Sequence, residues 1–355
     1  MTTGAPAIRG GLAPGDIVGG RLPQWGPRAV FGAAAVLVLL LAQVSGVNPV
    51  LLAVAATVVA GVGVHAWSRA VEGARRAKDR TITLLVTSAF VIAVAPLVSV
   101  VWTVVGRGWA RFDVAFFTES ARNVVGAGGG AYHAIVGTLM ITLVATVASV
   151  PIGIMAAVYL NEYGRGRLKA GLIFFVDVMT GIPSIVAGLF AFALFAIFLG
   201  PGIRLGVMGA VALSVLMIPI VVRSTEEMLK IVPNGLRESS YALGVPKWRT
   251  VVKVVLPTAF PGIVTGVMVA VARVIGETAP LLITTGTFSS VNWNPFSGRM
   301  ENLPVFSYTQ YKNPGVPKTP YIDRAWAAAL TLILIVMVLN LIARLLYRRF
   351  GKEAR

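Results

Sequence analysis

Long apolar stretches, separated by short polar connections, dominate the chain from residue 29 onward. A helix needs about 20 apolar residues to cross the hydrocarbon core of a bilayer. By that measure the pattern predicts eight transmembrane helices, at about 29–45, 48–67, 82–106, 134–160, 171–199, 205–222, 260–284 and 325–347. We therefore expect an all-α membrane protein.

The first two predicted spans are separated only by Gly46, Val47 and Asn48, which predicts a helical hairpin over 29–67. Residues 1–28 are polar and rich in Gly and Pro. Because the first apolar stretch leads directly into a second one, we do not expect a cleaved signal peptide. We expect a disordered cytoplasmic tail over 1–28.

The composition agrees with a membrane protein. Hydrophobic residues make up 56% of the 355 residues and charged residues 13%, whereas a soluble domain carries about 25% charged residues. The absence of cysteine excludes a disulfide scaffold, cysteine-ligated zinc, iron–sulfur clusters and a thiol nucleophile. His65 and His133 are far apart in the sequence, which argues against a histidine metal site.

The net charge of +17 follows the predicted topology. With eight spans both termini lie on one side, and that side carries 22 of the 31 Lys and Arg residues, against 8 on the other. Because Lys and Arg accumulate in cytoplasmic loops, both termini are expected to be cytoplasmic. The charge is thus a topology signal and an attraction to the inner leaflet, and it does not indicate a nucleic-acid partner.

Motifs for catalysis are absent from the sequence. There is no Gly-x4-Gly-Lys-Ser/Thr phosphate loop, and Gly351-Lys352 is followed by Glu353. No zinc-protease motif, nucleophile elbow or pair of catalytic carboxylates stands out. We do not expect this chain to hydrolyse ATP or to be an enzyme.

The loop 223–259 contains two short predicted helices. Asn234 is a plausible N-cap of the first, and Gly244 suits the left-handed position after its last residue. Pro246 prevents continuation, and a second helix is predicted from Lys247 to Val255. Taken alone, this pattern is also compatible with an amphipathic helix lying on the bilayer surface.

The spacing within this loop resembles the EAA loop of ABC-importer permeases. Glu238-Ser239-Ser240 is followed after three residues by Gly244, and after nine more by Val254, Val255 and Leu256-Pro257. Serines replace both alanines of the family pattern, and valine replaces isoleucine. The resemblance implies that 223–259 carries the coupling helix, which docks into a groove of an ATPase subunit and passes on its motion.

Five further stretches carry a family pattern: Leu160–Gly164, Gly181–Val186, Pro219–Glu227, Ala272–Leu282 and Ala325–Leu346. Together they resemble the PstA-type phosphate permeases, over about residues 80–350. The resemblance implies a type I ABC importer permease domain of six helices at 80–350, with the hairpin at 29–67 outside the usual pattern.

This resemblance also implies partners. They are a second, homologous permease (PstC-like), two ATPase subunits (PstB-like), an extracytoplasmic phosphate-binding protein (PstS-like) and the lipid bilayer of a bacterial inner membrane. ATP and Mg would be bound by the ATPase subunits, with no cofactor on this chain. The alternatives are an importer of another oxyanion, such as sulfate or molybdate, and a secondary transporter or channel that works without an ATPase.

Arg273 and Glu277 are the most informative residues within a predicted span. A charge at that depth costs several kcal/mol unless it is paired or faces a wet cavity. Four positions apart on one helix, the two side chains are expected to share a face and to form an ion pair. That pair either packs the bundle or forms a phosphate pathway with Thr278. The arginine fork suits an oxyanion, and Glu277 can accept a hydrogen bond from a phosphate that still carries a proton.

Four other features of the sequence have less specific interpretations. Gly181 and Pro183 predict a kink or a pore-lining break in the span 171–199. Gly262-x-x-x-Gly266 predicts a face that packs closely on a neighbouring helix. Asp177 is expected to pack or to lie at the membrane interface. The aromatic loop 285–324 is expected to form an ordered external surface for a partner, with a solvated flap as the alternative.

Overall fold

The computed structural model describes residues 22–23, 25–45 and 49–350. All regular elements within these ranges are helices, and no strand occurs in them. The predicted all-α membrane class is confirmed. The predicted tail 1–28 lies largely outside the described residues, although the first helix already begins at Trp25.

The described chain divides into two compact units, Met1–Val100 and Val101–Arg355. In the first unit, α1 (Trp25–Ser45) and α2 (Pro49–Glu72) lie against each other as a hairpin, followed by α3 (Ala74–Gly108), which extends past the boundary between the units. Glu72, the last residue of α2, forms an ion pair with Arg80 of α3, in which Arg80 Nε lies 2.6 Å from Glu72 Oε2.

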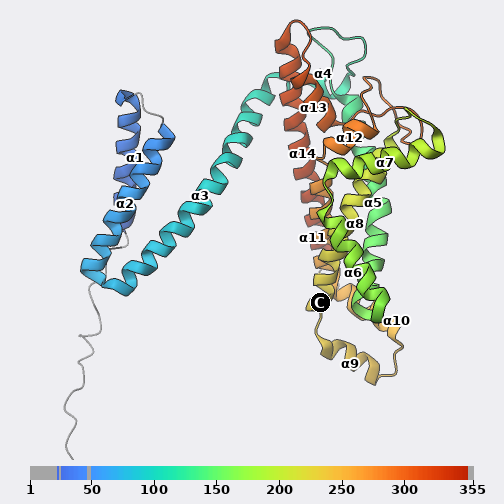
Figure 1. The fold of residues 1–355 in the computed structure, drawn as a ribbon, viewed down its shortest axis with the longest axis horizontal. Coiled ribbons are helices and arrows are strands. Elements are labelled where there is room, and N and C mark those ends of the chain that lie inside the picture. The colour runs from blue at the N-terminus through green and yellow to red at the C-terminus, as the bar shows by residue number, and fades with distance from the viewer. Residues whose placement is uncertain (1–21, 24, 46–48, 351–355) are drawn as a thin grey trace, which may run out of the picture. The chain divides into compact units, whose positions relative to one another are not determined.

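The second unit contains long helices joined by short ones. Figure 1 shows the long helices of this unit running side by side, with α9 at one end and α12 and α13 at the other. Its elements are η1 (Trp109–Arg111), α4 (Val114–Thr118), α5 (Tyr132–Val158), the π-helical turn η2 (Tyr159–Tyr163), α6 (Gly166–Gly181), α7 (Ser184–Leu199), α8 (Gly206–Ile231), α9 (Asn234–Ala242), α10 (Lys247–Thr250), the π-helical turn η3 (Val251–Val255), α11 (Leu256–Val274), α12 (Ala279–Thr284), α13 (Leu303–Lys312) and α14 (Lys318–Phe350).

Six described helices are long and apolar enough to cross a membrane, and α6 with α7 makes a seventh if the pair counts as one span. The first predicted span falls on α1, whose described apolar stretch Ala29–Val38 is shorter than the others. The interruption of the span 171–199 predicted from Gly181 and Pro183 is confirmed, because α6 and α7 meet at 108° at these residues. Ile182 precedes Pro183 and is extended, as steric contact with a proline ring favours.

Small residues let α8 approach its neighbours closely. A Cβ atom on Gly153 of α5 would lie 2.6 Å from Val221 Cγ1 of α8. On α11, Gly262 and Gly266 face Met228 and Ser224 of α8 with no room for a side chain. The close-packing face predicted for Gly262 and Gly266 is thus confirmed, and it fixes α11 against α8.

Candidate functional site

The predicted span 260–284 is broken next to its charged residues. Helix α11 ends at Val274, and a turn at Ile275 and Gly276 separates it from α12. The expectation of a continuous helix through Arg273 and Glu277 was therefore wrong. Because the four-residue helical relation is lost, no ion pair joins these two side chains in the described ranges. Arg273 is exposed in the last turn of α11, and Glu277 is half-buried.

The break is held in place by close packing on both sides of α12. A Cβ atom on Gly188 of α7 would lie 2.6 Å from the Cα atom of Pro280, so that only glycine fits there. Pro280 lies in the first turn of α12, where its missing N–H removes no helical hydrogen bond. Gly209 of α8 leaves similar space for Leu281 and Thr285. The break between α11 and α12 is therefore fixed by tertiary packing against α7 and α8.

Substitution of Gly188 by leucine is expected to force α12 away from α7. Overpacking of this kind costs about 1–3 kcal/mol, and we expect the midpoint of thermal unfolding in detergent to fall by several degrees. Gly171→Leu on α6 is the matched control, since nothing lies within 4 Å of a Cβ atom at Gly171. Equal effects of both substitutions would contradict the packing described here.

A cavity of about 340 Å³ opens beside the break. It is formed by the turn after α11 together with α13 and α14. Of the predicted pathway residues it includes Thr278, whereas Arg273 and Glu277 are not among its lining residues. The lining is Gly276, Thr278, Pro304, Ser307, Tyr308, Tyr311, Ala325, Trp326, Ala329 and Leu332.

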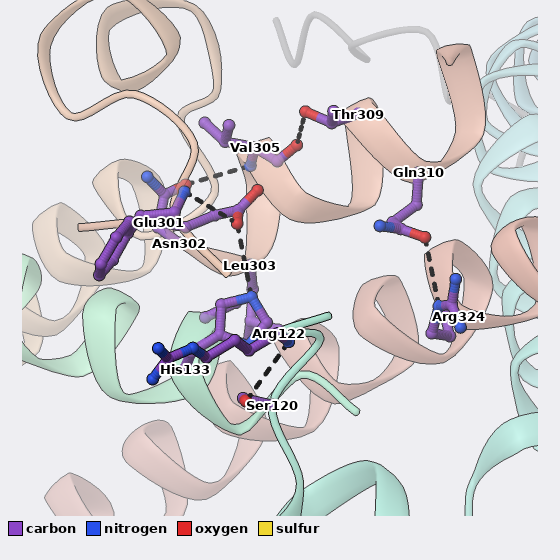
Figure 2. Close-up of polar contacts among 12 residues, drawn as sticks. Ser120, Arg122, His133, Glu301, Asn302, Leu303, Val305, Thr309, Gln310 and Arg324 are labelled. Carbon is purple, nitrogen blue, oxygen red and sulfur yellow. Dashed lines mark hydrogen bonds and ion pairs between the residues drawn. The ribbon is translucent and has the colours of Figure 1, made fainter. Parts of the chain in front are cut away.

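Buried polar side chains join α5 to the segment before α13. His133 Nε2 of α5 lies 3.4 Å from Glu301 Oε2, with both side chains at most 5% exposed. Figure 2 shows the Glu301 carboxylate pointing toward the His133 ring, beside Asn302 at the start of α13. The side chain of Asn302 caps α13 by accepting a hydrogen bond from Val305 N at 3.1 Å. The segment before α13 is thus fixed on α5.

Arg324 of α14 is a second buried group that sequence reasoning missed. It is 1% exposed, and its Nη1 donates to the carbonyl oxygens of Gly126 and Gly128 at 2.8 and 2.7 Å. Its Nε donates to Gln310 Oε1 (Figure 2). The loop 285–324 contains α13, so it is ordered as predicted, but Phe306 is buried in the core and is not part of a surface.

At the opposite end of the unit, the loop between α8 and α11 has the predicted two-helix form. Gly244 has a φ of +74°, Gly244 N donates to Tyr241 O at 2.9 Å, and Val245 N donates to Ser240 O at 3.2 Å. This pair of hydrogen bonds is a Schellman motif. The N-cap is Pro233 and not Asn234 as predicted. The second helix continues through η3 into α11 without a gap.

The predicted coupling residues occupy different environments in this loop. Glu238 and Ser239 are exposed on α9, whereas Ser240 is buried and its Oγ lies 2.8 Å from Thr250 Oγ1 of α10. Leu256 and Pro257 begin α11. Large apolar side chains also face outward here: Leu236, Tyr241, Leu243 and Trp248 are exposed, and Leu243 at the turn is 83% exposed.

Asp177 of α6 forms an ion pair with Arg223 of α8, and Arg223 Nη1 lies 3.0 Å from Glu226 Oε2. Lys230 Nζ approaches the same carboxylate at 2.7 Å. Because Asp177 and Arg223 are partly exposed, their pairing contributes little to stability. The expected packing or interfacial role of Asp177 agrees with this contact.

Comparisons with known proteins agree on one family. The family model described as "Binding-protein-dependent transport system inner membrane component" matches residues 149–355. A curated relative, phosphate transport system permease protein PstA 1 of Mycobacterium tuberculosis (strain ATCC 25618 / H37Rv), is 47% identical over 275 residues, covering 77% of this chain and 88% of the relative. Phosphate transport system permease protein PstA of Yersinia pestis is 39% identical over 277 residues, covering 78% and 92%.

Among solved structures, a bacterial ABC transporter involved in the import of the acidic polysaccharide alginate matches 78% of this chain and 99% of its own, with a TM-score of 0.54 and 13% identity. At 13% identity, this match supports a shared fold and no shared function. The sequence matches extend over most of the chain and of the relatives. The chain therefore belongs to the family of inner membrane components of binding-protein-dependent transport systems, and within it to the PstA-type permeases.

Proposed function

We propose that this chain is a transmembrane permease subunit of an ATP-driven importer of inorganic phosphate, which moves phosphate from the external side to the cytoplasm. The observation that carries the proposal is the similarity to phosphate transport system permeases, at 47% identity over 275 residues. The loop at α9 and α10 supports it, because a rigid two-helix loop with exposed apolar side chains suits docking to a motor subunit.

The assembly that we propose contains a second, homologous permease, two ATPase subunits and an extracytoplasmic phosphate-binding protein. ATP and Mg would be bound by the ATPase subunits. On this chain, Leu243, Tyr241 and Trp248 would contact an ATPase subunit, and the exposed Trp293 and Phe296 of the opposite end would face the binding protein. Both termini would then be cytoplasmic, as the distribution of Lys and Arg predicts.

For the mechanism, we propose that closure of the ATPase dimer moves α9. The two permeases rock from inward-facing to outward-facing, and phosphate passes a central site without any bond in it being made or broken. Arg273 suits that site because it is exposed on the single chain, in the last turn of α11, where a second permease can complete the environment. Glu277 and Thr278 follow directly in the break.

Oxyanion selectivity tests the proposed substrate. The complete assembly in proteoliposomes is expected to take up radiolabelled phosphate with ATP in the lumen, and an excess of sulfate or molybdate is expected not to compete. Competition by sulfate as strong as that by unlabelled phosphate would favour the alternative importer class. Failure of the ATPase subunits to co-purify with this chain would favour a secondary transporter.

Substitution of Glu277 by glutamine is expected to relax the preference for phosphate over sulfate. The carboxylate accepts a hydrogen bond from the O–H group that phosphate keeps at neutral pH, and it repels fully ionised sulfate. A site built on such a hydrogen bond discriminates strongly. The measurement is the ratio of phosphate to sulfate uptake in the variant and in the wild type. An unchanged ratio of phosphate to sulfate uptake would show that Glu277 does not determine selectivity.

A further inference from the structure

Glu162, in the π-helical turn η2 at the end of α5, holds both helices of the loop that carries Gly244. Its carboxylate oxygen Oε1 accepts hydrogen bonds from Arg237 of α9, from Nη2 at 2.8 Å and from Nε at 3.2 Å. Its backbone carbonyl accepts a hydrogen bond from Lys247 Nζ at the start of α10. We call Glu162, Arg237 and Lys247 the Glu162 cluster. One residue of η2, which directly follows α5, thus holds the helices on both sides of the Gly244 turn.

The Glu162–Arg237 pair of this cluster is largely shielded from solvent, and Lys247 is half-buried. The side chains of Glu162 and Arg237 are 6% and 13% exposed. Arg237 also donates to the carbonyl oxygens of Val232 and Leu229 at 2.7 and 2.9 Å, which lie at the end of α8. Removing one partner of a buried pair leaves the other charge uncompensated. The cluster is therefore a stiff connection between α5, α8 and the two-helix loop.

The other end of α5 also makes close contacts, in this case with the segment before α13. The backbone carbonyl of Glu301 lies against Gly137, where no Cβ atom would fit. Leu303 N donates to Thr138 Oγ1 at 2.8 Å. His133 and Glu301 add the buried contact shown in Figure 2. A displacement of α5 along or across its axis therefore reaches this segment.

We infer that α5 transmits the movement of the coupling loop to the opposite face of the permease, and that the Glu162 cluster is the joint through which it does so. The inference rests on the proposed function, in which an ATPase moves α9. Glu162 and Arg237 are positioning residues here, because they act through α5 and touch no substrate. Packed elements with two discrete arrangements carry such motion, whereas solvated contacts between them would absorb it.

The test uses the complete assembly in proteoliposomes, with ATP hydrolysis and phosphate uptake measured on the same preparation. Glu162→Ala is expected to leave the ATPase subunits bound and hydrolysing, while phosphate uptake per ATP falls by roughly tenfold. Arg237→Ala is expected to lower uptake per ATP to a similar extent. The double variant is expected to lose no more uptake per ATP than the more impaired of the two single variants, because both changes break the same connection.

Two further variants keep the result interpretable. Glu227→Ala removes an exposed carboxylate from α8 and is the matched control, with unchanged uptake per ATP expected. If Glu162→Ala fails to assemble, Glu162→Gln removes the charge at constant size and is expected to lower the same ratio. Unchanged uptake per ATP in a Glu162 variant, or additive losses in the double variant, would overturn the inference.

A readout independent of phosphate separates this inference from the proposed function. The chain contains no cysteine, so Ser297→Cys, at an exposed residue of the segment before α13, gives one labelling site in an assembly with cysteine-free partners. ATP is expected to change the labelling rate in the otherwise unaltered chain and not in Glu162→Ala. An equal change in both would refute transmission through Glu162, whatever substrate is carried. Absent phosphate uptake in the unaltered assembly would instead refute the substrate.

Discussion

Substitution of Arg273 by alanine is expected to abolish phosphate uptake by the assembled transporter, by about a hundredfold or more. A guanidinium donates two parallel hydrogen bonds to an oxyanion, and in a site shielded from water no other group replaces them. Since Arg273 is exposed on the single chain and makes no ion pair in the described ranges, its removal should leave the fold and the assembly intact.

The measurement is uptake of radiolabelled phosphate in proteoliposomes, with co-purification of the ATPase subunits as the test of assembly. Arg165→Ala, which removes an exposed arginine at the start of α6, is the matched control and should transport normally. Arg273→Lys keeps the charge without the planar fork and is expected to recover only part of the activity. Normal uptake by Arg273→Ala would exclude this residue from the pathway.

Substitution of Leu243 by aspartate is expected to release the ATPase subunits. Leu243 is 83% exposed at the turn after α9, so the permease itself loses no packing. In the proposed assembly the same position is buried against an ATPase subunit, where a charge without a partner costs about 2 kcal/mol or more. We expect binding of purified ATPase subunit to weaken by about thirtyfold, measured by titration of the permease pair in detergent.

Val316→Asp is the matched control for this prediction. Val316 is 86% exposed on the segment between α13 and α14, at the end of the unit away from α9 (Figure 1). A charge there should leave ATPase binding unchanged. If Leu243→Asp bound the ATPase subunit as tightly as the wild type, the docking surface would have to lie elsewhere.

Local sequence signals predicted the coupling loop well. The left-handed backbone at Gly244 follows from the freedom of glycine, and Pro246 can only end one helix and begin another. The close approach at Gly262 and Gly266 likewise follows from the small size of these residues. Such features depend on a few neighbouring residues, and therefore a single sequence contains them.

The geometry of the charged pathway could not be predicted in the same way. Apolar residues continue through 260–284, so the pattern favoured one helix across Arg273 and Glu277. Gly276 and Pro280 were the available signals for the break, but what holds it is the contact between Pro280 and Gly188 on another helix. The Glu162 cluster joins residues up to 85 positions apart in the sequence. Tertiary contacts of this kind leave no local pattern.

Uptake of radiolabelled phosphate into proteoliposomes of the complete assembly, without any ion gradient, measures most directly whether a separate motor drives phosphate through this permease. Accumulation is expected only when ATP is present on the side that carries α9, and none is expected with a non-hydrolysable analogue. Uptake without ATP, or uptake driven by an imposed proton or sodium gradient, would contradict this expectation.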